Sequence, residues 1–388
     1  MQNIKLLNKI SKCGTNELCR DIYNVGEDVD APVGILVRSA AMHEMEIPET
    51  LLGIARAGAG VNNIPIAKCT EAGVVVFNTP GANANAVKEL VICGLMLSAR
   101  NIIGGIEWAK GLDSDVAKTV EKGKGQFAGH EISGKTLGVI GLGAIGGLVA
   151  NTAIHLGMNV IGCDPYLSIE AAWNLNHHVE RAATYDEIYA KADYITFHIP
   201  ATETTKGIIN AENIAKMRDG VKILNFSRSE LASEDDVIAA IESGKVSAYV
   251  TDFPTERMLG VKGVVAIPHL GASTEESEDN CARMAAIQLD DYIRHGNIKN
   301  SVNFPAVSMP ESTGYRVCVL HKNVPAMISK ITQSLSEHGI NIENMTNKSR
   351  GEVAYSMFDV CTPVPESVID DINAIDGIIR GRFIDQKN

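Results

Sequence analysis

The sequence has few features of membrane proteins or of proteins that bind nucleic acids. Its most apolar stretch, residues 91–97, is too short to cross a bilayer, and residues 1–13 contain lysines but no long apolar core or small-residue cleavage site. Positive charge is also scarce, since 35 Lys and Arg stand against 47 Asp and Glu, a formal net charge of −12. A phosphate polymer or an anionic membrane usually meets a basic face, so we expect neither as a partner and predict a cytoplasmic protein.

Spacings typical of zinc sites are missing as well. The eight cysteines are scattered, without a CxxC pair or a neighbouring group of histidines, which argues against a zinc site. In a reducing compartment such cysteines are free thiols. We therefore expect no metal ion.

The chain can form several domains, because 388 residues with 45% hydrophobic side chains fill two or three ordinary cores. Uninterrupted β-branched runs bounded by turns are typical of strands buried on both faces of a parallel sheet. In the first part of the chain they lie at 33–37, 51–55 and 74–77. A long helix over about 85–103 and a Gly- and Lys-rich boundary passage at 121–125 follow. We predict a discontinuous, flavodoxin-like α/β domain that comprises residues 1–99 and 280–305.

The same alternation of strand and helix resumes in the middle of the chain. Six short apolar runs lie at 136–140, 159–163, 194–198, 221–226, 247–252 and 263–267. Six strands with crossover helices are what a doubly wound parallel sheet requires. We predict an α/β nucleotide-binding domain of this type over residues 100–279, followed by an amphipathic helix over 275–293 that returns the chain to the first domain.

The tail follows a linker marked by Pro305 and Pro310, and it has a different pattern of strands and helices. Strand, helix, strand, strand, helix and strand are expected at 315–320, 324–338, 340–344, 352–360, 365–374 and 378–384. This βαββαβ order describes a small ferredoxin-like module. We predict a third domain over residues 314–388.

The strongest single motif is a GxGxxG turn with glycines at Gly141, Gly143 and Gly146, between an apolar strand and a helical stretch. Such glycines allow a tight turn and a close approach of the backbone to a pyrophosphate, which faces the helix N-terminus. Asp164 ends the next strand at the distance expected for a carboxylate that binds ribose hydroxyls. A carboxylate there repels a 2′-phosphate, and Pro165 and Tyr166 supply no cation, so NAD is predicted rather than NADP.

Two further strand ends carry residues suited to proton transfer on a small carboxylate. Arg228 follows the run 221–226 and should project at the carboxyl edge of the sheet, where a guanidinium matches a carboxylate bidentately. His269 follows the run 263–267, and histidine titrates near neutral pH, which suits a general base. Glu256 is a carboxylate that could orient it.

Taken in order, the motifs GLGAIG, CDP, NFSR, DFPTE and PHLGAST resemble those of the D-2-hydroxyacid dehydrogenases, roughly over residues 30–300. The resemblance implies that Arg228, Glu256 and His269 are catalytic. His269 would remove the 2-hydroxyl proton, hydride would pass from C2 to NAD, and Arg228 would hold the carboxylate. It also implies contacts with NAD by Gly141, Gly143, Ala144, Ile145, Gly146, Asp164, Phe226, Ser227, Arg228, Asp252, His269, Leu270, Gly271 and Ala272.

Some positions differ from the family pattern. Gly is common where Ser229 stands, and Ala is common where Lys88 stands. The stretch before Glu256 is one residue shorter than usual, which affects the placing of Asp252 more than that of Glu256.

The substrate is predicted from the first domain, the boundary passage and the tail. The resemblance places the substrate on the loop with Arg56, Gly58, Ala59 and Gly60, and Lys124 matches a basic position of phosphoglycerate dehydrogenases. The tail resembles the ACT regulatory domains of serine-pathway dehydrogenases, with an amino acid, expected to be serine, held by His321, Asn323 and Asn341. ACT domains also serve as dimer interfaces alone.

These resemblances imply NAD-dependent oxidation of D-3-phosphoglycerate to 3-phosphohydroxypyruvate, the first step of serine biosynthesis, by a homodimer or homotetramer. Two alternatives remain open from the sequence. One is a glyoxylate or hydroxypyruvate reductase of the same family, and the other is an NAD-sensing interaction protein without activity.

Overall fold

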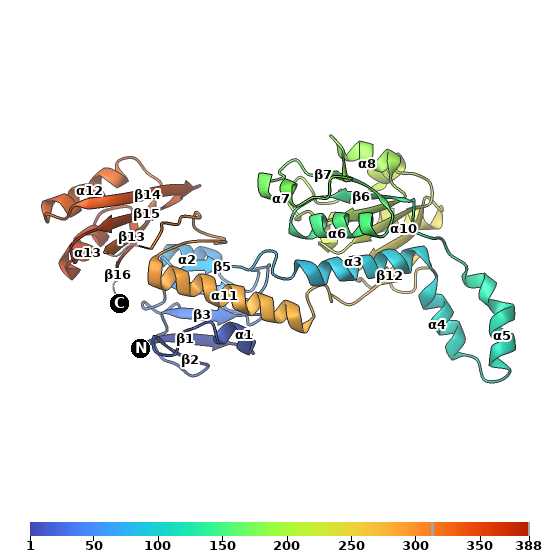
Figure 1. Cartoon of the computed structure of the whole chain (residues 1–388), viewed down its shortest axis with the longest axis horizontal. Coiled ribbons are helices and arrows are strands. Elements are labelled where there is room, and N and C mark those ends of the chain that lie inside the picture. Colours follow the sequence, from blue (N-terminus) through green and yellow to red (C-terminus); the bar gives the residue numbers. More distant parts are fainter. Residues whose placement is uncertain (312–313, 387–388) are drawn as a thin grey trace. The chain divides into compact units, whose positions relative to one another are not determined.

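The computed structural model describes residues 1–311 and 314–386, which divide into two compact units (Figure 1). One unit joins Met1–Asn83 with Glu275–Asn388, and the other is Ala84–Thr274. All eight cysteines are free.

The second unit is built on a parallel sheet of seven strands in the order β12-β11-β10-β9-β6-β7-β8. The strands are β6 (Thr136–Ile140), β7 (Asn159–Cys163), β8 (Glu180–Arg181), β9 (Tyr194–Phe197), β10 (Val221–Asn225), β11 (Val246–Thr251) and β12 (Val264–Ala266). This is the predicted doubly wound order with one strand added. All strands are parallel, and the order in which the chain adds strands to the sheet changes side between β6 and β9. The sequence did not indicate β8, because both of its residues are exposed at the sheet edge.

Helices cover this sheet and extend beyond it. They are α3 (Ala84–Ala99), α4 (Ile102–Lys110), α5 (Val116–Gly123), α6 (Ala144–His155), α7 (Ile169–Trp173), α8 (Tyr185–Lys191), α9 (Ala211–Lys216) and α10 (Glu234–Glu242), with the 3₁₀ turns η1 (Lys124–Phe127) and η2 (Ser229–Leu231). We assigned α3 to the first domain, whereas the structure packs it against α6, β10 and β11 in the second unit.

The single helix predicted over 85–103 is two helices in the structure. Asn101 lies between α3 and α4, and its side-chain oxygen accepts a hydrogen bond from the N–H of Gly104, so a new helix starts there. The Gly- and Lys-rich passage at 121–125 is helical, since it spans the end of α5 and the start of η1. Within the described residues, no single helix is long and apolar enough to cross a membrane, and α3 with α4 passes that test only as a pair bent by 71°.

The first unit contains a parallel sheet of five strands in the order β2-β1-β3-β4-β5. Its elements are β1 (Gln2–Leu7), α1 (Lys12–Thr15), β2 (Tyr23–Gly26), β3 (Gly34–Val37), β4 (Gly53–Arg56), α2 (Ile66–Glu71), β5 (Val75–Phe77) and α11 (Glu275–His295). This is the flavodoxin-like order, which confirms the predicted fold class of the first domain. Small and apolar residues of α11, among them Ala285 and Leu289, pack on the sheet in a core shared with Ile4 and Phe77.

The C-terminal part of this unit is an antiparallel sheet of four strands in the order β14-β15-β13-β16. Its elements are β13 (Tyr315–Lys322), α12 (Met327–Glu337), β14 (Ile342–Arg350), β15 (Val353–Val360), α13 (Glu366–Asn373) and β16 (Ile378–Asp385). This is the predicted ferredoxin-like order. One sheet face packs with α12 and α13, and the other shares the core of the flavodoxin-like sheet through Leu320, Tyr355 and Ile384. The last two residues of the predicted domain, 387–388, lie outside the described residues.

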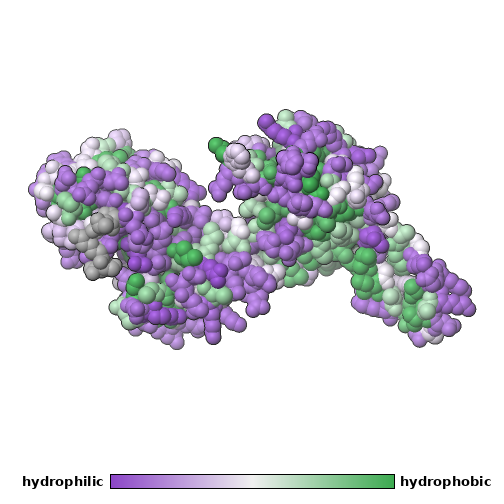
Figure 2. Space-filling model, viewed as in Figure 1, coloured by the Kyte–Doolittle hydropathy of each residue, from purple (hydrophilic) through white to green (hydrophobic). Residues whose placement is uncertain are grey.

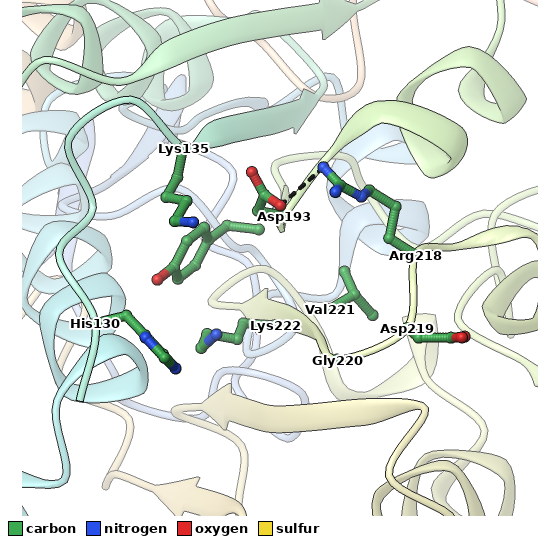
Figure 3. A pocket seen from close by; sticks show the side chains of 9 residues that line it. His130, Lys135, Asp193, Arg218, Asp219, Gly220, Val221 and Lys222 are labelled. Carbon is green, nitrogen blue, oxygen red and sulfur yellow. Dashed lines mark ion pairs between the residues drawn. The ribbon is translucent and has the colours of Figure 1, made fainter. Parts of the chain in front are cut away.

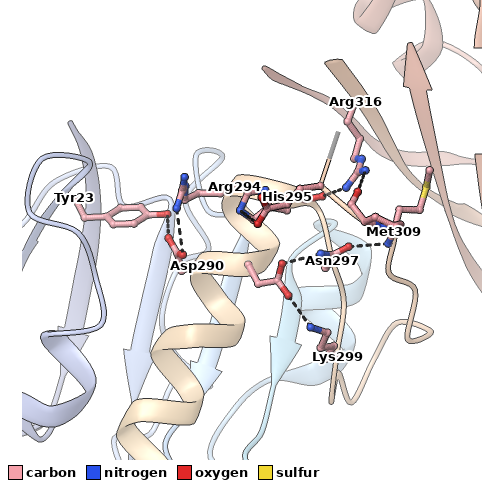
Figure 4. A network of polar contacts seen from close by, with 11 residues as sticks. Tyr23, Asp290, Arg294, His295, Asn297, Lys299, Met309 and Arg316 are labelled. Atoms are coloured by element: carbon pink, nitrogen blue, oxygen red, sulfur yellow. Dashed lines mark hydrogen bonds and ion pairs between the residues drawn. The ribbon is translucent and has the colours of Figure 1, made fainter. Parts of the chain in front are cut away.

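Arg316 of the ferredoxin-like module contacts the C-terminal end of α11 (Figure 4). Arg316 is fully buried, and its guanidinium lies 2.6 and 3.1 Å from the two carboxylate oxygens of Asp359. It also donates to the carbonyl oxygens of His295 and Pro310, each at 2.7 Å. Arg382 lies over the ring of Tyr292 at 4.5 Å from its centroid. These contacts join the module to the flavodoxin-like sheet by a common core as well as by the chain.

We expect Arg316→Met to destabilise this unit by about 3–5 kcal/mol, because it leaves the Asp359 carboxylate buried without a partner. The double variant Arg316→Met with Asp359→Leu should recover most of that loss, since it removes the unpaired charge. Urea unfolding followed by circular dichroism measures both effects. Equal stability of the single variant and the wild type would show that the buried pair does not hold the module in place.

Candidate active site

The glycine-rich turn lies between β6 and α6, beside the point where the strand order reverses. Gly141 has a φ of +89°, and a Cβ on it would lie 2.5 Å from the carbonyl oxygen of His198. A Cβ on Gly146 would lie 1.9 Å from the carbonyl oxygen of Gly141, so both positions require glycine. A Cβ on Gly143 would meet no protein atom within 4 Å, so open space borders the first turn of α6. An anionic group fits there, facing the helix N-terminus with Ala144 and Ile145.

Asp164 follows β7 and is bound to this turn. One carboxylate oxygen accepts the N–H of Leu142 at 2.9 Å, and the other accepts the N–H of Tyr166 at 2.9 Å. Each oxygen keeps a lone pair for a further donor, such as a ribose hydroxyl. The Tyr166 side chain is 93% exposed and brings no positive charge. This environment suits a ribose without a 2′-phosphate.

A second carboxylate, Asp252, lies directly after β11 and is only 1% exposed. It accepts a hydrogen bond from the N–H of Gly271, while its Oδ1 atom is buried without a hydrogen-bond partner among the described residues. Burial raises the pKa of Asp252, and the charges of His269 and Arg228 oppose this rise. A buried oxygen without a partner is costly unless a ligand supplies the donor. The amide nitrogen of a nicotinamide carboxamide fits that requirement.

Arg228 and His269 therefore lie within electrostatic reach of the same buried carboxylate. Arg228 is exposed after β10, and its loop is held because Asn225 Nδ2 donates to the Arg228 carbonyl oxygen at 2.8 Å. His269 is exposed after β12, and its ring packs on Phe253 with 4.6 Å between centroids. Both side chains come from the carboxyl ends of parallel strands, the edge at which ligands bind in this fold.

Glu256, the predicted partner of His269, does not contact it through a hydrogen bond or ion pair in the described part of the chain. It is exposed in the loop between β11 and β12. The carboxylate that acts on His269 in the structure is Asp252. The role of Glu256 stays a prediction.

The sequence did not single out His198, which the structure places beside the glycine-rich turn. Its Nε2 lies 3.0 Å from Thr196 Oγ1, and its Nδ1 is buried without a partner among the described residues. Burial lowers the pKa of His198 to about 3, so the ring is neutral at physiological pH. The signal that could have identified it is a polar side chain ending a buried strand at the reversal of strand order.

The remaining residues predicted at the cofactor lie in the same strand-end loops. Phe226 is 6% exposed and belongs to the core beneath the sheet, and Ser227 Oγ donates to the Phe197 carbonyl oxygen at 2.6 Å. Leu270 is 47% exposed, and Ala272 is partly buried.

The residues predicted to bind the substrate are divided between the units. Arg56 belongs to the first unit, where its Nε donates to the Arg38 carbonyl oxygen at 2.9 Å and its Nη1 donates to the Gly60 carbonyl oxygen, so it holds the loop 57–60. Lys124 belongs to the second unit, where it forms an exposed ion pair with Glu121 at 2.5 Å.

The three predicted regulatory residues do not meet within one chain. His321 is buried, with Nε2 2.9 Å from Ser356 Oγ and Nδ1 2.8 Å from the Lys322 carbonyl oxygen. Asn323 lies at the same end of β13 as His321, whereas Asn341 precedes β14 at the other end of the sheet.

Comparison with known proteins decides which family this site belongs to. Residues 95–271 match the family model described as D-isomer specific 2-hydroxyacid dehydrogenase, NAD binding domain. The chain is also 32% identical over 339 residues to D-3-phosphoglycerate dehydrogenase 1 of Saccharomyces cerevisiae, and this covers 81% of the chain and 68% of the yeast protein. The chain belongs to the D-2-hydroxyacid dehydrogenase family. The predicted resemblance is confirmed, and NAD is the cofactor of this dehydrogenase.

Other relatives extend the similarity. The D-3-phosphoglycerate dehydrogenase of Haemophilus influenzae is 28% identical over 365 residues, which cover 91% of this dehydrogenase and 86% of that protein. The NAD⁺-bound 3-phosphoglycerate dehydrogenase of Entamoeba histolytica has a TM-score of 0.60 at 28% identity, and covers 78% of this chain and 98% of its own. A glyoxylate reductase from Paecilomyes thermophila has a TM-score of 0.63 at 25% identity, with coverages of 78% and 98%.

Proposed function

We propose that this dehydrogenase oxidises D-3-phosphoglycerate to 3-phosphohydroxypyruvate with NAD, the first step of serine biosynthesis. The observation that carries the proposal is its match to proteins named D-3-phosphoglycerate dehydrogenase over most of its length, 81% of the chain for the yeast relative and 91% for the Haemophilus relative. Relatives with this name also come from cyanobacteria, archaea and mammals.

The side chains around Asp252 support the chemistry of this reaction. His269 is exposed and accepts the proton of the substrate 2-hydroxyl, and the Asp252 carboxylate stabilises the positive charge that the ring then gains. Arg228 is exposed beside them and holds the substrate carboxylate with its guanidinium. The buried Oδ1 of Asp252 has no partner among the described residues, and it would hold the nicotinamide carboxamide when NAD is bound. Bound NAD supplies the acceptor for the hydride from C2.

The alternative that a specific observation favours is a glyoxylate or hydroxypyruvate reductase, because one similar solved structure carries the name glyoxylate reductase. Rates of NADH oxidation with 3-phosphohydroxypyruvate, hydroxypyruvate and glyoxylate separate the two. We expect the phosphorylated substrate to have the highest kcat/KM. A higher kcat/KM for glyoxylate would favour the reductase, and no turnover with any of the three would favour a non-catalytic NAD sensor.

We further propose that the protein is a homo-oligomer. The helices α4 and α5 contain no buried residue, and they leave Ile102, Ile103, Ile106 and Val116 between 44% and 51% exposed. Figure 2 shows hydrophobic residues gathered on this arm, at the lower right of the view. In a homodimer, a second copy of the chain would cover these apolar side chains. Their removal from water would stabilise the dimer.

The C-terminal module is proposed as an ACT domain that binds serine between two copies. Its edge strand β14 is largely exposed, so two copies can pair along it. Because Asn341 and Asn323 lie at opposite ends of the sheet, an antiparallel pair would bring Asn323 beside Asn341 of the partner subunit. Both ring nitrogens of His321 are hydrogen-bonded within the module, one to the Lys322 carbonyl oxygen and one to Ser356 Oγ. His321 would therefore act on bound serine through Ser356.

Serine is therefore expected to lower the rate of the wild type, and Asn341→Ala is expected to remove this response. Asn341 is exposed and suits the test better than the buried His321. The measurement is the initial rate over a series of serine concentrations, with D-serine as the control ligand. A wild-type rate that millimolar serine does not change would leave the module as a dimer interface.

A further inference from the structure

A cationic pocket lies at the edge of the seven-stranded sheet opposite the glycine-rich turn. The turn follows the carboxyl end of β6, whereas the pocket is formed where strands begin, by Lys135 just before β6, by Asp193 and Tyr194 at the start of β9 and by Lys222 near the start of β10. His130 and residues 218–221 complete it, and its volume is about 180 Å³. No step of the proposed reaction uses these residues.

The negative charges that line this pocket are already neutralised. Asp193 forms an ion pair with Arg218 at 2.9 Å, and its other carboxylate oxygen accepts the N–H of Thr136 at 2.9 Å. Asp219 forms an ion pair with Lys245 at 2.7 Å. Both carboxylates therefore have an ion-pair partner, although the Asp193 charge also acts on Lys222.

Lys135 and Lys222 are the pocket lysines that lie beyond ion-pair distance of any carboxylate among the described residues. Within the described residues, neither forms an ion pair, and the Lys222 ammonium lies 4.9 Å from the centroid of the Tyr194 ring. Burial lowers the pKa of Lys222, the Asp193 carboxylate opposes this change, and the nearby charge of Lys135 adds to it. The two lysine charges repel each other in this half-buried pocket, and a bound anion would relieve that repulsion. Figure 3 shows the side chains of His130, Lys135 and Lys222 among those that line the pocket.

We propose that this pocket binds a phosphate group, either as free inorganic phosphate or as a small phosphate monoester. A phosphate dianion matches the charge of the two lysines, and its tetrahedral oxygens can accept from both ammonium groups and from the His130 ring together. The volume of about 180 Å³ admits a phosphate with a short organic group. The site is separate from the NAD site, because the two lie at opposite ends of the parallel strands.

Calorimetric titration of the NADH-bound full-length protein with inorganic phosphate tests this site. The double variant Lys135→Gln with Lys222→Gln should weaken the binding by at least about tenfold, because it removes two charge-assisted hydrogen bonds. The matched control is Lys191→Gln with Lys262→Gln, two exposed lysines of the same unit that do not line the pocket. The control should bind phosphate as the wild type does, and NADH affinity should be equal in all three proteins.

A second titration with glycerol 2-phosphate identifies the source of the phosphate group. Binding of the ester that the Lys135 and Lys222 substitutions weaken would assign the site to phosphorylated metabolites, and binding of the free ion alone would assign it to inorganic phosphate. An isotherm unchanged by the two substitutions would overturn the proposal. Loss of the heat of phosphate binding in sodium chloride of the same ionic strength would also overturn the proposal, because non-specific charge attraction that salt screens would then explain the binding.

Discussion

Replacement of His269 by Gln is expected to lower kcat by roughly a hundred- to ten-thousand-fold, the usual contribution of a general base. The glutamine amide keeps a donor and an acceptor in the same loop, but it cannot take up the proton of the substrate hydroxyl. The affinity for NADH should change little, because the ring of His269 is exposed and packs on Phe253 rather than in the core.

The measurement compares single-turnover rates and NADH dissociation constants of this variant with those of His155→Gln. His155 is an exposed histidine at the end of α6 in the same unit, so its replacement controls for the loss of a surface imidazole. Wild-type turnover by the His269 variant would disprove its assignment as the base. A parallel loss of NADH binding would show instead that His269 acts by shaping the cofactor site.

The second large effect is expected for Gly146→Ala, which should weaken NADH binding by roughly ten- to a hundredfold. The new Cβ would lie 1.9 Å from the Gly141 carbonyl oxygen, so the turn has to move away from the start of α6. Overpacking of this kind costs about 1–3 kcal/mol, and here the displaced backbone is the part that faces the pyrophosphate.

The neighbouring Gly147→Ala is the matched control for this prediction. A Cβ on Gly147 would lie 3.5 Å from the Leu142 carbonyl oxygen, which is ordinary van der Waals contact. Fluorescence titration with NADH should give a nearly unchanged dissociation constant for this variant. If Gly146→Ala bound NADH as tightly as Gly147→Ala, the close approach between turn and helix would not shape the cofactor site.

The strands were predictable wherever both faces of a strand are apolar. The run at 136–140 coincides with β6, whose last four residues are all buried. By contrast, β1 buries only Ile4 and β2 only Tyr23, so their sequences carry little apolar signal. Backbone pairing with neighbouring strands holds such elements, and a sequence pattern does not report it.

The helix boundaries between α3 and α5 were less predictable, because local signals there compete. Helical periodicity continues past residue 100, but the Asn101 cap starts a new helix. The glycines and lysines at 121–125 are typical of a linker, yet they lie in an exposed helical arm without a core of its own. The assignment of α3 to a unit depends on packing against α6, which lies about fifty residues further along the chain.

In the candidate site, the sequence identified side chains at strand ends but not all of their pairings. Arg228 and His269 were predictable because each follows an apolar run at the carboxyl edge of the sheet. The contact of Asp252 with the Gly271 N–H joins two separate loops, and only the fold brings it about. The motif predicts Glu256 as the partner of His269 and that role stays a prediction, whereas the electrostatic effect of His269 on Asp252 depends on the fold.

The most direct test of the proposed function is NADH formation by the purified full-length protein with D-3-phosphoglycerate and, in parallel, with D-glycerate. The two substrates share the carboxylate and the hydroxyl that Arg228 and His269 are proposed to bind, and they differ only in the phosphate. The proposal predicts a kcat/KM at least about a hundredfold higher for D-3-phosphoglycerate, because charge-assisted contacts to the phosphate are strong. Equal values for both substrates, or no NADH from either, would contradict it.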